Sequence, residues 1–215
     1  EDGIRDHCVT GVQTCALPIC LVRLVGELQH WNPKFFPSGP GGQGGFVGIV
    51  WLIPIVGFLV GRKLKQLGKA PGSRLFVLVA VLLGLGAIAG IGYQSMSFDE
   101  SAKVKQYFLY TIYGAGGAAV LVLLAWPRAF FALLGYGIFA RGPVIGIQYL
   151  MIHWNGEAPK THYELTHPKV GVLTAAERAH SLMLAQAGLW IPITIVAGAL
   201  FALLGSLTAR SPKDD

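Results

Sequence analysis

Arg141 is the residue of this sequence whose position most strongly suggests a chemical role. It lies at the centre of residues 129–152, which contain no other charged side chain. A charge at the centre of a bilayer costs about 2.5–3.5 kcal/mol on insertion scales. The apolar stretches of the chain contain no Asp or Glu, so an ion pair within them is excluded. Gln148 follows on the same helical face, and the two residues predict a contact with an anion or a substrate.

Two alternatives for Arg141 need no ligand. Gly142 and Pro143 follow it directly and could break the helix, because proline lacks a backbone N–H. The segment would then form a re-entrant or interfacial pair of short helices, from which Arg141 reaches the headgroups. Alternatively, Arg141 pairs with another subunit.

Four histidines are expected on one side of the membrane: His153, His162, His167 and His180. Neutral imidazole is a common ligand of metals and haem, and His153 and His180 are expected at similar depth on adjacent helices. The sequence therefore leaves two interpretations of these residues. Either they are ordinary interfacial histidines and the protein has no cofactor, or His153 and His180 hold a haem or a metal.

Motifs of the familiar soluble chemistries are absent from the sequence. Residues 39–44 match the dinucleotide pattern G-x-G-x-x-G, but that motif binds a nucleotide only between a strand and a helix, and a proline-containing stretch precedes it here. Glu157, Glu164 and Glu177 could serve as acids or bases, yet nothing in the sequence fixes their geometry. We predict no catalytic residues.

The composition is that of a membrane protein. Of the 215 residues, 53% are hydrophobic and 13% are charged, against about 25% charged in soluble domains, and the mean hydropathy is +0.55. A soluble enzyme and a disordered chain are both excluded, because so apolar a chain collapses or enters a bilayer.

Windows of about 20 apolar residues identify the helices that cross a bilayer. The sequence predicts an all-α polytopic membrane bundle with a membrane domain over 46–207 and five spans, at 46–61, 75–93, 107–126, 129–152 and 182–207. The alternative is four spans, with 129–152 re-entering the membrane. The last helix is expected to begin earlier, because Thr174 and Glu177 match a capping box.

The basic residues predict the orientation, since Lys and Arg near helix ends are retained in the cytoplasm. The linker between the first two spans carries five of them and no acid: Arg62, Lys63, Lys65, Lys69 and Arg74. We therefore expect a bacterial inner-membrane protein with its N-terminus outside and a cytoplasmic tail at 208–215. The net charge of +6 is explained by topology, and no nucleic-acid partner is expected.

No membrane span is expected in the first 45 residues. Residues 1–19, EDGIRDHCVTGVQTCALPI, resemble the translation of a sequencing adapter, which implies that they are not native. Residues 20–45 contain several Pro and Gly residues and predict an irregular juxtamembrane segment.

Small residues recur four apart in the spans, at Gly57 and Gly61, Gly86 and Gly90, and Gly142 and Gly146. Such faces let helices approach closely in lipid, so we expect a tight bundle and a possible homo- or hetero-oligomer in the bilayer. Because the helices are Gly-rich and candidate chemistry is sparse, the expected function is a non-enzymatic membrane component. It is either a subunit of a larger complex or a small transporter-like protein, and the alternative is a haem- or metal-binding redox subunit.

Overall fold

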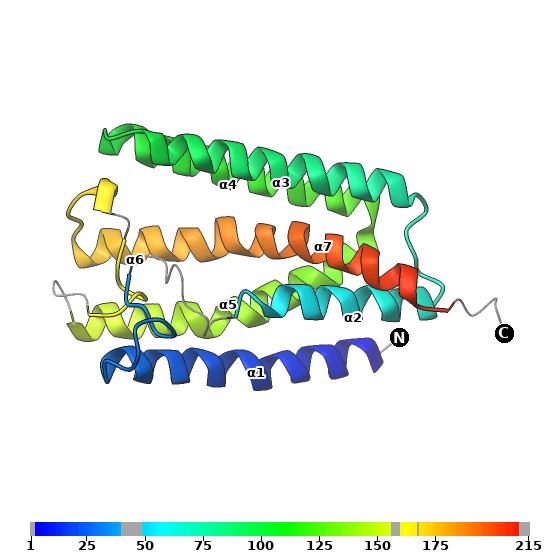
Figure 1. The fold of residues 1–215 in the computed structure, drawn as a ribbon, viewed down its shortest axis with the longest axis horizontal. Coiled ribbons are helices and arrows are strands. Elements are labelled where there is room, and N and C mark those ends of the chain that lie inside the picture. Colours follow the sequence, from blue (N-terminus) through cyan, green and yellow to red (C-terminus); the bar gives the residue numbers. More distant parts are fainter. Residues whose placement is uncertain (1–2, 40–48, 156–159, 167, 211–215) are drawn as a thin grey trace.

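The protein is an all-α bundle in the computed structural model, which describes residues 3–39, 49–155, 160–166 and 168–210. Its helices run roughly parallel or antiparallel to one long axis (Figure 1). In chain order they are α1 (Gly3–Leu28), α2 (Leu52–Gln66), α3 (Arg74–Ser97), α4 (Ser101–Ala125), α5 (Pro127–Asn155), the short η2 (Pro168–Val170), α6 (Ala175–Leu184), the π-helical turn η3 (Ala185–Trp190) and α7 (Ile191–Thr208). The described residues contain no strand, so the predicted fold class is confirmed.

Four stretches of helix are long and apolar enough to cross a membrane: Arg74–Ser95, Ser101–Ala125, Pro127–Asn155 and Ala175–Thr208. They coincide with four of the five predicted spans. The capping box predicted at the start of the last one is present, because Thr174 Oγ1 accepts from the Glu177 N–H and the Glu177 side chain accepts from the Thr174 N–H. These four helices support an integral membrane protein.

The span predicted at residues 46–61 is shorter in the structure than expected. Its helix, α2, has 15 residues, which at about 1.5 Å per residue is roughly 22 Å, less than the ~30 Å hydrocarbon core. Residues 46–48 lie outside the described part of the chain. Figure 1 shows α2 beginning near the middle of the bundle and ending at one end of it. The described chain thus combines four long apolar helices with one half-length helix.

Helix α5 corrects the alternative that residues 129–152 re-enter the membrane. It runs without interruption through Gly142 and Pro143 for 29 residues. A proline inside a membrane helix is tolerated where neighbouring groups satisfy the backbone that it frees. Arg141 therefore lies in the middle of a continuous helix rather than at a break.

The segment at 20–45, predicted to be irregular, is helical in its first part, because α1 continues to Leu28. Helix α1 begins at the end of the bundle where α7 ends (Figure 1) and packs on α5. Its first part coincides with residues 3–19, which resemble an adapter translation, so the orientation of the native chain stays a prediction.

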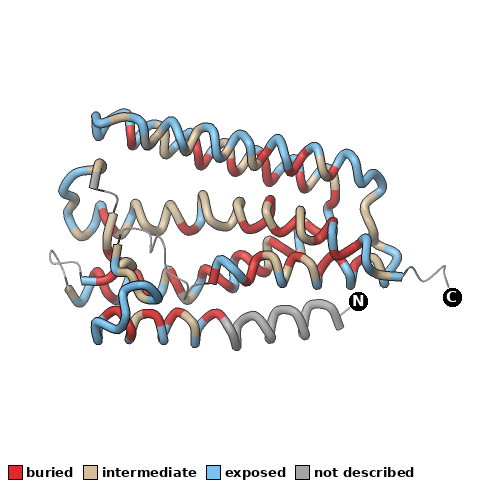
Figure 2. Tube along the Cα trace, in the orientation of Figure 1, coloured by how far each residue is buried: buried red, intermediate tan, exposed pale blue. Residues whose placement is uncertain are grey.

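The core is formed where α7 meets its neighbours. Figure 2 shows buried residues gathered along α2, α5 and α7, while α3 and α4 are exposed along their outer sides. Trp126, between α4 and α5, is 2% exposed and donates its indole N–H to the Lys69 carbonyl at 3.0 Å. This bond ties the turn between α4 and α5 to the basic linker.

Helices α2 and α7 pack almost backbone to backbone. A Cβ added to Gly61 would lie 1.8 Å from the Ala202 carbonyl oxygen, and one added to Gly57 would lie 2.5 Å from that of Gly198. The predicted small face at Gly57 and Gly61 is therefore used within the chain. A Cβ on Gly86, Gly90, Gly142 or Gly146 would meet nothing within 4 Å.

We expect Gly61→Ala to destabilise the protein by about 1–3 kcal/mol, the usual cost of overpacking, because the added methyl group meets backbone that cannot rotate away. Gly86→Ala is the matched control and should change stability by less than about 0.5 kcal/mol. The measurement is the thermal midpoint of each variant in the same detergent. Equal midpoints for the two variants would contradict the close approach of α2 and α7.

Candidate ligand-binding site

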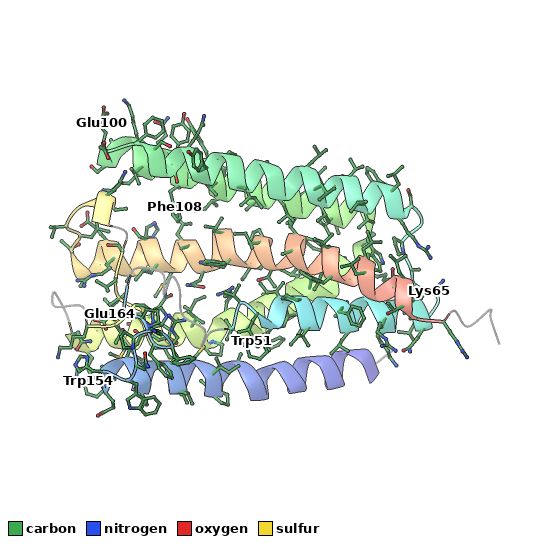
Figure 3. All side chains as sticks on the ribbon, in the orientation of Figure 1. Trp51, Lys65, Glu100, Phe108, Trp154 and Glu164 are labelled. Carbon is green, nitrogen blue, oxygen red and sulfur yellow. The ribbon has the colours of Figure 1, made fainter. Side chains whose placement is uncertain are left out.

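A cavity of about 640 Å³ lies inside the bundle, between α1, the start of α2, α5, η3 and α7. Most of its wall is apolar. Its polar side chains come from different elements: Arg23, Arg141, Gln148, His162, Tyr163 and Gln186. Trp51, the residue before α2, also lines it and is labelled in Figure 3. The start of the half-length helix therefore forms part of the cavity wall.

Arg141 is the buried charge of this cavity. It is 5% exposed, and its Nε has no hydrogen-bond partner. Its Nη1 lies 3.5 Å from Gln186 Oε1, which is long for a hydrogen bond, and its guanidinium stands 4.8 Å from the centre of the Trp190 ring. No ion pair to Arg141 occurs among the described residues. Its positive charge therefore lacks an anionic partner in the part of the chain that the structure describes.

Gln148 lines the same cavity two turns further along α5. It is 3% exposed and its Oε1 accepts no hydrogen bond. The structure thus brings together the two residues that the sequence singled out as ligand-binding. Each buried polar group left without a partner costs about 1–3 kcal/mol, so a ligand that satisfied both would stabilise the site.

Gln186 and Trp190 belong to the site, but the sequence analysis did not select them. Both lie within the stretch 182–207. They belong to the π-helical turn η3, which ends two residues before Pro192. Such turns are often found at functional sites in helices. A polar residue inside an apolar span was the available signal for Gln186, as it was for Gln148.

A buried network closes the cavity at the end near Leu28. Glu27 is 3% exposed and accepts from Arg23 Nε at 3.0 Å and from the His162 backbone N–H at 2.9 Å. His162 Nδ1 lies 2.5 Å from Glu27 Oε1. These contacts join α1 to the loop that follows α5.

The pKa values of this pair are shifted in the same direction. Burial opposes ionisation of Glu27, but the hydrogen bonds and charge of His162, with the Arg23 guanidinium, outweigh it and lower the pKa of Glu27. Burial lowers the pKa of His162, and the contact with Glu27 offsets only part of that effect. At neutral pH the carboxylate is therefore ionised and the imidazole is neutral, with Nδ1 facing Glu27 Oε1.

The loop is further held by Glu164, one of the candidate acids of the sequence, which Figure 3 labels. Glu164 is fully buried and accepts from Asn155 Nδ2 and from Thr161 Oγ1, each at 2.9 Å. Next to it, the Tyr163 hydroxyl donates to the Cys20 carbonyl at 3.1 Å. Glu164 organises the loop and does not line the cavity.

The structure places His153 and His180, the two candidate haem or metal ligands, on the surface of the described chain. His153 is exposed and stacks on Tyr149, with 6.4 Å between ring centres, and His180 is exposed on α6. His167 lies outside the described residues. Among those that are described, no group of three or more His, Cys, Asp or Glu side chains could hold a metal ion.

Comparison with protein-family models, with curated proteins and with solved structures finds no match to this chain. The site is therefore interpreted from its own geometry.

The docking of α1 should weaken as the pH falls. Unfolded His162 gains a proton near its ordinary pKa of 6.5, and the folded protein gains it at lower pH, so stability falls below about pH 6.5. Glu27, with a lowered pKa, adds a further loss below its ordinary value of 4.5. The loss caused by protonation of His162 is measured by comparing the hydrogen-exchange protection factors of residues 20–28 at pH 7.5 and pH 5.5.

His162→Gln should remove the difference between the two pH values, because the titrating group is gone. His180→Gln, a change to an exposed histidine, is the control and should keep it. Protection that is the same at both pH values in the unmodified protein would contradict the role of His162.

Proposed function

We propose that the protein is a non-enzymatic, multi-pass membrane component that binds an anion in the cavity beside Arg141. It acts either as a small transporter-like protein or as the ligand-binding subunit of a larger complex. The observation that carries this proposal is one buried guanidinium with an unpartnered Nε on a cavity wall.

An anion explains the site better than a neutral ligand does. Buried charges in proteins are normally paired, and a charged residue inside a membrane helix usually marks a ligand or ion pathway. The cation–π contact with Trp190 compensates only part of the lost hydration of Arg141. An anionic oxygen at Nε would complete its coordination.

Binding, rather than catalysis, fits the other polar groups of the wall. Gln148 and Gln186 are amides, which do not transfer protons near neutral pH. Besides the two arginines, the titratable side chains that line the cavity are Cys20, His162 and Tyr163. His162 Nδ1 faces Glu27, and the Tyr163 hydroxyl donates to the Cys20 carbonyl. The wall therefore supplies hydrogen bonds and a positive charge, which are what anion binding requires.

The basic residues support an orientation within this proposal. Lys65, which Figure 3 labels, lies at one end of the bundle, opposite Glu100 and Trp154. The other residues of the basic linker lie close to it in the chain: Arg62, Lys63, Lys69 and Arg74. We propose that this end faces the cytoplasm of a bacterial cell, so that the end nearer Glu27 and His162 faces outward.

The exposed glycines of α3 offer a surface on which a partner subunit can pack. Gly86 and Gly90 on α3 are exposed, and nothing in the described chain approaches them. Small residues of this kind allow another membrane helix to come close. We therefore propose that any oligomer forms through α3. Gly57 and Gly61 are not available for this contact, because α7 packs on them.

We expect Arg141→Gln to weaken anion binding at least tenfold, because the amide keeps much of the bulk but loses the charge. Inorganic phosphate and dodecyl phosphate are the probes, and the readout is tryptophan fluorescence of the full chain in phosphatidylcholine nanodiscs. Trp190 stands beside Arg141, so Trp190→Phe should remove most of the signal.

Arg74→Gln is the matched control. It removes an equal charge from an exposed position at the basic end of the bundle and should leave the affinity unchanged. An equal loss in both variants, or no saturable binding of either probe to the unmodified protein, would reject the proposed function.

A further inference from the structure

A second hollow adjoins the cavity and differs from it in chemistry. It is a groove of about 320 Å³ lined by Pro54, Ile55, Phe58, Leu59 and Phe201, all apolar, from α2 and α7. Pro54 and Phe201 line the cavity as well. One continuous surface therefore leads from the polar wall around Arg141 to an apolar groove.

The groove opens on the outside of the bundle. Ile55 and Leu59 are 48% and 55% exposed and stand one turn apart on α2. Because α2 and α7 approach so closely at Gly57 and Gly61, larger side chains stand beside their contact and form the walls of the hollow. In a bilayer, an apolar hollow on this outer surface meets hydrocarbon chains rather than water.

The start of α2 lies where the two hollows meet. Trp51 caps the helix without a side-chain hydrogen bond, and Leu52 and Ile53 donate their N–H groups to the carbonyls of residues 49 and 50 at 3.1 Å. These N–H groups are thus engaged, and α2 contributes the positive end of its dipole rather than free donors. That field adds to the charge of Arg141 at the polar end of the surface.

The unpartnered atoms specify the polar end of a ligand. Arg141 Nε needs an acceptor, and Gln148 Oε1 needs a donor. A phosphate monoester brings between one and two negative charges and several acceptor oxygens at neutral pH. Its singly ionised form, which predominates below the second pKa of about 6, also keeps one O–H that can donate to Gln148 Oε1. A carboxylate brings a single charge and two acceptor oxygens, and it pairs with Gln148 only through the amide N–H groups.

We propose that the ligand is an amphiphilic phosphate monoester, with its headgroup between Arg141 and Gln148 and its hydrocarbon chain in the groove between α2 and α7. This inference rests on the proposed function and adds the chemical class of the ligand. Charge complementarity places the headgroup beside Arg141. Pro54 and Phe201 line both hollows, so they connect the headgroup site to the groove for the hydrocarbon chain.

The test compares three probes on the full chain in phosphatidylcholine nanodiscs, and isothermal titration calorimetry measures each affinity, because the substitutions used below add a tryptophan. They are dodecyl phosphate, inorganic phosphate and dodecanol. Dodecyl phosphate should bind at least tenfold more tightly than either of the other two, since only it has both the charged head and the chain.

Ile55→Trp tests the groove, because a larger ring at this exposed position fills the hollow without entering the core. It should lower the affinity for dodecyl phosphate at least tenfold and leave the affinity for inorganic phosphate unchanged. Leu82→Trp is the matched control, placed on α3 at a residue that is 54% exposed and lines neither hollow, and it should change neither affinity.

The outcomes separate this inference from the proposed function. Equal affinities for inorganic and dodecyl phosphate, both reduced by Arg141→Gln, would overturn the amphiphile and leave anion binding intact. The amphiphile would also be overturned if dodecanol bound as tightly as dodecyl phosphate. The same holds if Ile55→Trp left the affinity for dodecyl phosphate unchanged. Binding that Arg141→Gln does not alter, or no binding at all, would overturn both.

Discussion

The close approach of α2 to α7 is the contact on which the rest of the structure depends. Gly61 leaves no room for a side chain against the Ala202 carbonyl, and Gly205 leaves none against that of Phe58. In lipid, where apolar side chains gain little by leaving the hydrocarbon, such backbone contacts supply the dispersion energy that holds helices together. They anchor a helix of 15 residues at one end of the bundle, and the space beyond its first turn becomes the cavity.

The buried charge of Arg141 lies on the wall of that cavity. The continuous α5 carries it at mid-length, where a charge is costly in a bilayer. The cavity instead surrounds the guanidinium with the Gln186 amide and the Trp190 ring. These groups are neutral, and neutral partners stabilise a buried cation less than a charged one does. The site keeps a positive charge without an anionic partner among the described residues, and this charge is the basis of the proposed anion binding.

What the sequence could predict was set by local signals. Four long apolar helices, the Thr174 cap, and Arg141 with Gln148 each depend on composition or spacing within one segment. The half-length of α2 could not be found this way, because Gly and Pro continue the uncharged run on its N-terminal side. Trp126 bonds to Lys69 and Tyr163 bonds to Cys20, and both contacts join residues far apart in the sequence, so no local pattern indicates them. The bonds of Glu164 to Asn155 and Thr161 join residues close in sequence but depend on how the loop folds.

An anion bound beside Arg141, as proposed, would also act on the other end of the cavity. Arg23 and His162, which hold Glu27, line the same space as Arg141. An anion in that space favours the protonated form of His162, because a negative charge nearby offsets the burial that lowers its pKa. By linkage, protonation of His162 then strengthens anion binding by the same factor. The same proton loosens the docking of α1 on the loop, since a buried cation replaces a neutral imidazole beside Arg23. Acidification therefore acts on the site in two opposite ways, and the stronger depends on whether the anion or water occupies the cavity.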